Sequence, residues 1–187
     1  IAIQVFFPYL MVYIQNILGI VDGDFTLTFG IVLVVSCIIT IIVGLFLDKI
    51  GKNKVLIPSI ILGTIGAILF FFAKNMIFAI ISGTILITGY MVSIAVFNAK
   101  IRDYTPEKEV GLFQGIRMIF VVLIPMVTGP YIGEALSLIN KNEYINEYGK
   151  TVIAPNAFIF LGTAIVLALS IIPVVIFLKK EKGLKHE

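Results

Sequence analysis

Charged residues, cysteine and histidine are all scarce in this sequence, and each shortage excludes a class of protein. Only 13% of the 187 residues carry charge, whereas 59% are hydrophobic, and the mean hydropathy is +1.09. A soluble domain of this length could not bury so much apolar surface, so we exclude an ordinary soluble domain. The single cysteine, Cys37, excludes a disulfide within the chain. The single histidine, His186, has no partner ligands near it in sequence.

The sequence also lacks the short motifs that carry enzyme or nucleotide chemistry. It has no zinc-ligand spacing, no phosphate-binding glycine loop and no nucleophile elbow. We therefore expect no enzyme activity, no metal site and no cofactor. The net charge of +3 does not point to nucleic acid, because the lysines and arginines lie in short loops between apolar runs.

Long apolar runs are abundant. A helix of about 20 residues, at ~1.5 Å per residue, crosses a bilayer, and the period-two alternation of a β-barrel is not visible. Ile1 already lies inside such a run, without an initiator methionine or a basic leader, so we expect a span of a longer protein rather than a signal peptide. We predict an all-α membrane protein whose single domain, 1–187, has six transmembrane helices, at residues 1–20, 25–47, 55–73, 76–99, 106–135 and 154–178.

The loops between these runs alternate in charge. One set carries ten cations and the other carries Lys74, Lys141 and Lys150. Basic loops stay on the cytoplasmic side of a membrane, so this bias predicts that the ten-cation side is cytoplasmic. With six spans, both ends of the chain are then cytoplasmic. The ten cations are Lys49, Lys52, Lys54, Lys100, Arg102, Lys108, Lys179, Lys180, Lys182 and Lys185.

The turn between the second and third runs is polar and bounded by glycines. A glycine at 44 would let a neighbouring helix approach closely, and one at 51 would permit a sharp reversal. A carboxylate at 48, at the membrane edge, is costly unless it meets a cation or a helix N-terminus. The alternative is a plain basic loop with a chance aspartate. The residues of this motif are Gly44, Asp48, Lys49, Gly51 and Lys52.

One cation interrupts the fifth run. Arg117 lies 11 residues past Pro106, roughly 16 Å along a helix, and so at or inside the hydrocarbon edge. At about 100° per residue, Gln114, Arg117 and Thr128 form one polar stripe. Two interpretations stay open: a cavity wall that contacts an anion or a sugar, or an arginine that snorkels to the interface or pairs with Asp103 or Asp48.

Two further groups of residues are candidates for packing and for solute contact. Gly129 and Gly133 share a helical face and allow close packing, and Pro130 between them favours a bend. Hydroxyl, amide and tyrosine side chains on the first and fourth runs suit a neutral polyol, although hydrogen bonding between helices would explain each of them as well. These solute-contact candidates are Gln4, Tyr9, Tyr13, Asn16, Tyr90 and Ser93.

The glycine-bounded turn resembles motif A of the major facilitator superfamily, of the form G-x-x-x-D-[RK]-x-G-[RK], and Gly129–Gly133 is similar to a G-P-x-x-G element of the family's fifth helix. The resemblance implies one half of a twelve-helix carrier, a six-helix unit with a 3+3 inverted repeat, which binds solute against a missing six-helix half. In the family, motif A latches one half to the other, and we assign Arg117 to the same latch. Strings at 6–10, 102–106 and 111–118 look like the C-terminal half of bacterial glycoside–pentoside–hexuronide:cation symporters, although an N-terminal half stays open.

We therefore predict secondary transport of a small solute, a sugar or related polar compound, by alternating access in the bacterial cytoplasmic membrane. A co-transported cation, H⁺ or Na⁺, is implied by the resemblance alone, because the family's cation-site carboxylates lie in the missing half. Two alternatives stay open: half of a drug or amphiphile efflux transporter, and a membrane assembly module that transports nothing.

Overall fold

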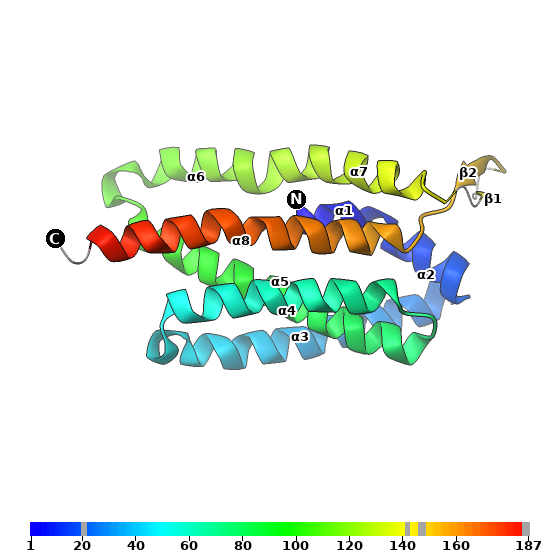
Figure 1. Cartoon of the computed structure of the whole chain (residues 1–187), viewed down its shortest axis with the longest axis horizontal. Coiled ribbons are helices and arrows are strands. Elements are labelled where there is room, and N and C mark those ends of the chain that lie inside the picture. Colours follow the sequence, from blue (N-terminus) through cyan, green and yellow to red (C-terminus); the bar gives the residue numbers. More distant parts are fainter. Residues whose placement is uncertain (20–21, 141–142, 146–148, 185–187) are drawn as a thin grey trace.

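The apolar runs form long helices in the computed structural model, which describes residues 1–19, 22–140, 143–145 and 149–184 (Figure 1). Within this part of the chain, five helices are long and apolar enough to cross a membrane. They overlap the second to sixth predicted spans. They are α3 (Asp22–Ile50), α4 (Lys52–Phe71), α5 (Met76–Tyr104), α8 (Phe158–Leu184) and a composite of α6 (Val110–Met118), the π-helical segment η3 (Ile119–Leu123) and α7 (Ile124–Ser137).

The first apolar run is helical but is not one continuous helix. It consists of α1 (Ala2–Phe6), the 3₁₀ turn η1 (Phe7–Tyr9) and α2 (Leu10–Leu18). Pro8 lies in the 3₁₀ turn, and because proline has no backbone N–H it cannot continue an α-helical hydrogen-bond ladder. The N-terminus lies about halfway along the bundle, so this segment runs beside only part of α8 (Figure 1).

The π-helical segment η3 corrects the prediction of one polar stripe along the fifth span. A π-helical turn inserts one extra residue relative to an α-helix, which rotates everything after it by about 100°. Gln114 and Arg117 precede the insertion and Thr128 follows it. The Thr128 hydroxyl donates to the Ile124 carbonyl of its own helix, at 2.8 Å.

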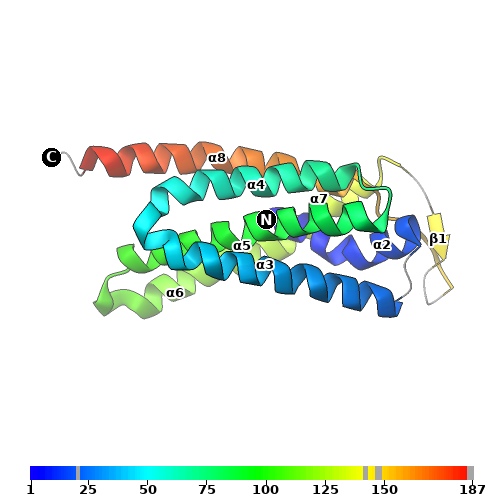
Figure 2. The same cartoon turned by 90° about the horizontal axis from the view of Figure 1, so that it is seen from below.

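The helices form a bundle with two faces. α4 packs against α5 and α8, α3 packs against α5, and α1 packs against α7 and α8. Figures 1 and 2 show α4 and α8 side by side on one face, with α3, α5 and α6 on the opposite face. Between them lies an aromatic core in which Phe160 contacts Phe6, Tyr13 and Phe70, with ring centroids 4.2–5.5 Å apart.

α4 and α5 approach at backbone distance. A Cβ atom on Gly66 would meet the backbone of Leu86, and one on Gly89 would meet the backbone of Gly63. The hydroxyls of Ser59 and Ser93 hydrogen bond across this contact, at 2.9 Å. Small residues thus bring the two helices together, as is common between helices in membranes.

The predicted pair Gly129 and Gly133 lies where α7 meets α1. A Cβ on Gly129 would meet Gln4, and one on Gly133 would meet the Val5 carbonyl and the Tyr9 ring. α7 continues as a helix through Pro130. Within this chain, these glycines therefore let α7 pack closely against the first segment.

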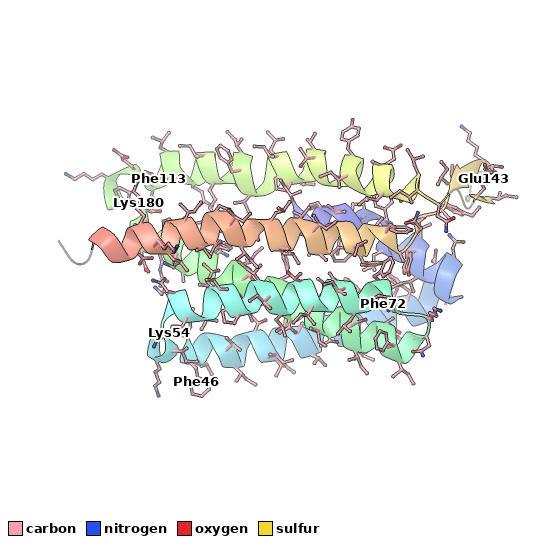
Figure 3. All side chains as sticks on the ribbon, viewed as in Figure 1. Phe46, Lys54, Phe72, Phe113, Glu143 and Lys180 are labelled. Carbon is pink, nitrogen blue, oxygen red and sulfur yellow. The ribbon has the colours of Figure 1, made fainter. Side chains whose placement is uncertain are left out.

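The two ends of the bundle differ in charge. We call the end that holds the α3–α4 turn, the α5–α6 turn and the end of α8 the basic end; Lys54 and Lys180 lie there, opposite Glu143 (Figure 3). The opposite end holds a short antiparallel pair, β1 (Glu143–Ile145) and β2 (Thr151–Ile153), between the fifth and sixth predicted spans.

Candidate functional site

The glycine-bounded turn at the basic end reverses the chain between α3 and α4. Gly51 adopts φ +94°, a conformation that favours glycine, and its N–H donates to the Leu47 carbonyl at 2.9 Å. Gly44 is exposed, and a Cβ there would meet nothing within 4 Å, so it permits no close helix approach inside this chain, contrary to the reason given from sequence. Asp48 belongs to α3, and its side chain lies outside the described residues.

Lys52 of this turn pairs with the end of α5. Its Nζ atom lies 2.6 Å from Oδ2 of Asp103, and the two side chains are 23% and 46% exposed. The pair ties the α3–α4 turn to the fourth span within the same bundle. Lys49, also part of the motif, is exposed and lies 6.0 Å from the centre of the Phe46 ring.

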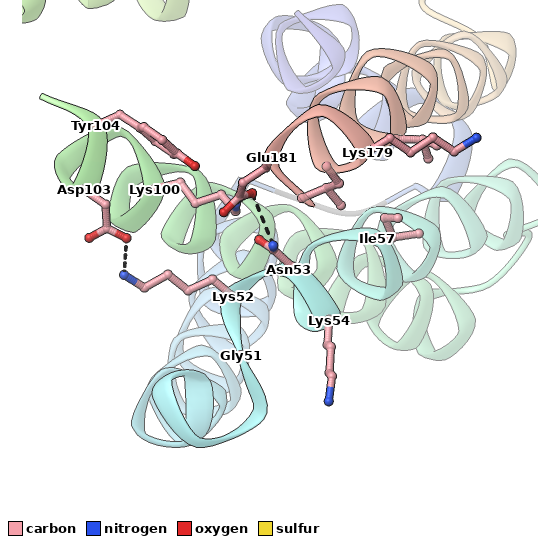
Figure 4. Close-up of a pocket in the computed structure, with 12 residues that line it drawn as sticks. Gly51, Lys52, Asn53, Lys54, Ile57, Lys100, Asp103, Tyr104, Lys179 and Glu181 are labelled. Carbon is pink, nitrogen blue, oxygen red and sulfur yellow. Dashed lines mark hydrogen bonds and ion pairs between the residues drawn. The ribbon is translucent and has the colours of Figure 1, made fainter. Parts of the chain in front are cut away.

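A second, more buried ion pair lies beside the first (Figure 4). Lys100 of α5 donates to Glu181 of α8 at 2.7 Å, with side chains only 7% and 12% exposed, and Asn53 of α4 donates to the same carboxylate at 3.2 Å. Three helices thus meet at one carboxylate. Sequence reasoning missed this cluster because its members lie 81 and 128 residues apart. Both lysine and glutamate are almost never buried without a partner.

A polar groove of about 850 Å³ lies between α5 and α6, also near the basic end. Arg117 projects into it and donates to the Asn98 side chain at 2.6 Å, and Gln114 lines the same wall. The predicted alternative of an Arg117–Asp103 pair is not present, because Asp103 pairs with Lys52. A guanidinium has five N–H donors, and the Asn98 oxygen cannot satisfy all of them. The groove therefore retains donors for an anionic or hydroxyl-bearing group.

Three of the predicted solute contacts serve helix packing instead. Tyr13 is 1% exposed and packs on Phe160, and Ser93 is buried and bonded to Ser59. The Tyr9 hydroxyl donates to the Pro130 carbonyl at 2.8 Å. Tyr13 and Ser93 are corrections to the predicted set, because both are buried against other helices of the same bundle.

The other predicted contacts have more varied surroundings. Asn16 is exposed, and Gln4 is half-buried with its Cβ against Gly129. Tyr90 is half-buried and lines a narrow apolar gap between α5, α1 and α8. None of the three lines the groove that holds Arg117.

An apolar recess of about 500 Å³ adjoins this groove, between α5, α6 and α8, and shares Phe113 with it. Phe97, Phe177 and Pro173 also line the recess. Among the described residues, no group of three or more histidine, cysteine, aspartate or glutamate side chains could hold a metal ion. The basic end therefore combines ion pairs, a polar groove and an apolar recess around α5.

The sequence matches the model of a known protein family. The family model described as Major Facilitator Superfamily matches residues 1–187. The curated proteins and the solved structures that were compared gave no match.

Proposed function

The chain belongs to the Major Facilitator Superfamily, a family of membrane transporters, and we propose that it forms one six-helix half of a two-half carrier that moves a small polar solute by alternating access. The chain is an integral membrane protein, and the part of it that the structure describes has five apolar helices that can cross a membrane. The segment α1–α2 would add a sixth span. The second half would come from the same transporter, with this chain as its C-terminal half.

The packing pattern is the observation that carries this proposal. We number the six spans in chain order, from α1–α2 as span 1 to α8 as span 6. Exchanging span 1 with span 4, span 2 with span 5 and span 3 with span 6 converts the main contacts between helices into one another. The α3–α5 contact maps onto α7–α1, α4–α5 maps onto α8–α1, and α4–α8 maps onto itself. Such an exchange is expected of a 3+3 inverted repeat. Under this exchange α3 would correspond to α6–α7. Both are little buried: in the most apolar stretch of each, only 17% and 6% of the residues are buried.

The proposed solute path runs along the face of α3, α5 and α6–α7. This face carries the groove with Arg117 and Asn98, whose donors and acceptors suit a hydroxyl-rich or anionic compound such as a sugar or sugar acid. Cation coupling, by H⁺ or Na⁺, would come from the second half. The positive-inside rule would put the basic end in the cytoplasm of a bacterial cell.

The turn between α3 and α4 would act as a conformational latch. Asp48 would engage the second half, while Lys52, held by Asp103, fixes the turn to α5. We expect Asp48→Asn and Arg117→Ala each to lower uptake at equal expression in the full transporter, with Lys108→Gln as a control for charge at the same end. Unchanged uptake in both variants would rule out the latch.

The apolar recess beside α6 favours a second candidate, the transport of an amphiphile or drug. Thermal stabilisation of the purified protein by a panel of sugars and a panel of amphiphiles separates the two. The proposal predicts that sugars raise the melting temperature of the wild type and fail to do so in Arg117→Ala. Stabilisation by amphiphiles alone, lost in Phe97→Ala and kept in Arg117→Ala, would favour efflux, because Phe97 lines the recess and not the groove. Stabilisation by neither panel would favour an assembly module.

A further inference from the structure

The cleft between the basic ends of α4 and α8 combines a cationic rim with an apolar floor (Figure 4). It encloses about 800 Å³. Ile57, Val175 and Leu178 supply apolar side chains, and the exposed Lys54 and Lys179 lie at its edge. Because the cleft offers both positive charge and apolar surface, a ligand that fits it should be amphiphilic.

The charges in this cleft do not cancel. Four lysines line it, and two of them use the cleft's two carboxylates: Lys52 pairs with Asp103, and Lys100 pairs with Glu181. Lys54 and Lys179 form no ion pair with any side chain that the structure describes. In Figure 4 they extend away from the paired cluster, with Ile57 between them. Among the side chains that the structure describes, nothing compensates these two positive charges of the outer rim.

The position of the cleft indicates where its ligand comes from. α4 and α8 form the face opposite the groove with Arg117, so the cleft is not part of the proposed solute path (Figure 2). Apolar side chains continue along both helices away from the lysines, and Ile61 and Ile172 are 42% and 58% exposed. In a membrane protein, lysines at the end of such an apolar surface lie at the level of the lipid headgroups.

We propose that this cleft is a binding site for an anionic phospholipid. The phosphate lies between the ends of α4 and α8, and the flexible Lys54 and Lys179 side chains, which point outward in Figure 4, turn toward it, while an acyl chain lies along Ile57 and Val175. Basic pockets between helices on the positive side of a membrane bind such headgroups. A soluble phosphate would gain nothing from the apolar floor, which is why the ligand is a lipid. The inference rests only on membership of the membrane-transporter family and not on the solute or its coupling.

Native mass spectrometry of the purified protein, titrated with phosphatidylglycerol or phosphatidylcholine, tests the site. The wild type should retain phosphatidylglycerol in preference to phosphatidylcholine. Each lysine near an anionic headgroup contributes about 1 kcal/mol, so Lys54→Gln/Lys179→Gln should weaken phosphatidylglycerol binding about 30-fold. The matched control is Lys49→Gln/Lys180→Gln, which removes the same charge from the same end but leaves the cleft intact, and it should keep the preference.

Three results would overturn the proposal. Equal losses in the two double variants would mean diffuse attraction to the basic end rather than a site. Competition by soluble glycerol 3-phosphate at the same concentration as the lipid would mean a soluble anion site. No preference in the wild type would mean no anionic lipid site. All four lysines are exposed, so each variant should fold, and its unfolding temperature provides the check.

Discussion

At the scale of single residues, the decisive feature is the pairing of charges at the basic end. Glu181 and Lys100 are almost fully buried, and each is tolerated only because the other is 2.7 Å away. Removing one partner of such a pair leaves an uncompensated buried charge, which costs more than the pair contributes. The more exposed pair of Lys52 and Asp103 is a different case, because solvent screens it.

We predict that Lys100→Met lowers the free energy of unfolding in detergent by less than Glu181→Gln does. Lys100→Met leaves a buried carboxylate that still accepts from the Asn53 side chain, whereas Glu181→Gln leaves a buried ammonium group without a carboxylate partner. Glu181→Gln should cost about 3 kcal/mol or more. The double variant Lys100→Met/Glu181→Leu should recover much of this loss, since no buried charge is left. Lys180→Gln, an exposed neighbour on α8, should stay within about 0.5 kcal/mol of the wild type. Equal effects of Glu181→Gln and Lys180→Gln in denaturant titrations would contradict the assignment.

At the scale of helices, the sequence predicted where helices lie better than how they face. Uncharged runs long enough to span a bilayer leave the backbone little choice but a helix, so α3, α4, α5 and α8 could be located from hydropathy. The direction in which a side chain faces is harder to predict, because an irregular turn rotates every residue that follows it about the helix axis. The 3₁₀ turn at Pro8 and the π segment Ile119–Leu123 each change the number of residues per turn, and the second rotates Thr128 away from the predicted stripe.

The candidate site was predictable only in part, for a related reason. The glycine-bounded turn could be found because its residues are neighbours in sequence. Glu181 and Asn98 could not be found, because each acquires its role from a partner on another helix, Lys100 and Arg117. Hydropathy contains no information about which helices meet.

The close contact of α4 and α5 gives a prediction at this scale. Gly66→Ala would push a methyl group into the backbone of Leu86, so the helices must separate, and overpacking of this kind costs about 1–3 kcal/mol. Gly44→Ala meets nothing within 4 Å, and alanine favours a helix by about 1 kcal/mol over glycine, so it should leave stability unchanged or raise it. Unfolding titrations of the two variants measure the difference. A loss in Gly44→Ala as large as that in Gly66→Ala would contradict the packing described.

At the scale of the whole molecule, we propose that the two faces of the bundle have different surroundings. The face of α4 and α8 would contact lipid, with a phospholipid held by Lys54 and Lys179 at its basic end. The face of α3, α5 and α6–α7 would contact the second half across a water-filled solute path. Exposed apolar side chains occur on both faces, so exposure alone does not distinguish them.

The most direct test of this division is the accessibility of spin labels in the transporter reconstituted in nanodiscs, on a Cys37→Ser background. Asn98→Cys reports on the proposed path and Ile176→Cys on the lipid face; they lie at similar depth, six residues before Tyr104 and five before Glu181 at the basic end. The account predicts that a water-soluble nickel chelate relaxes the label at 98 and that oxygen dissolved in the bilayer relaxes the label at 176. A label at 98 that responds to oxygen as strongly as the one at 176, and is not reached by the chelate, would contradict it.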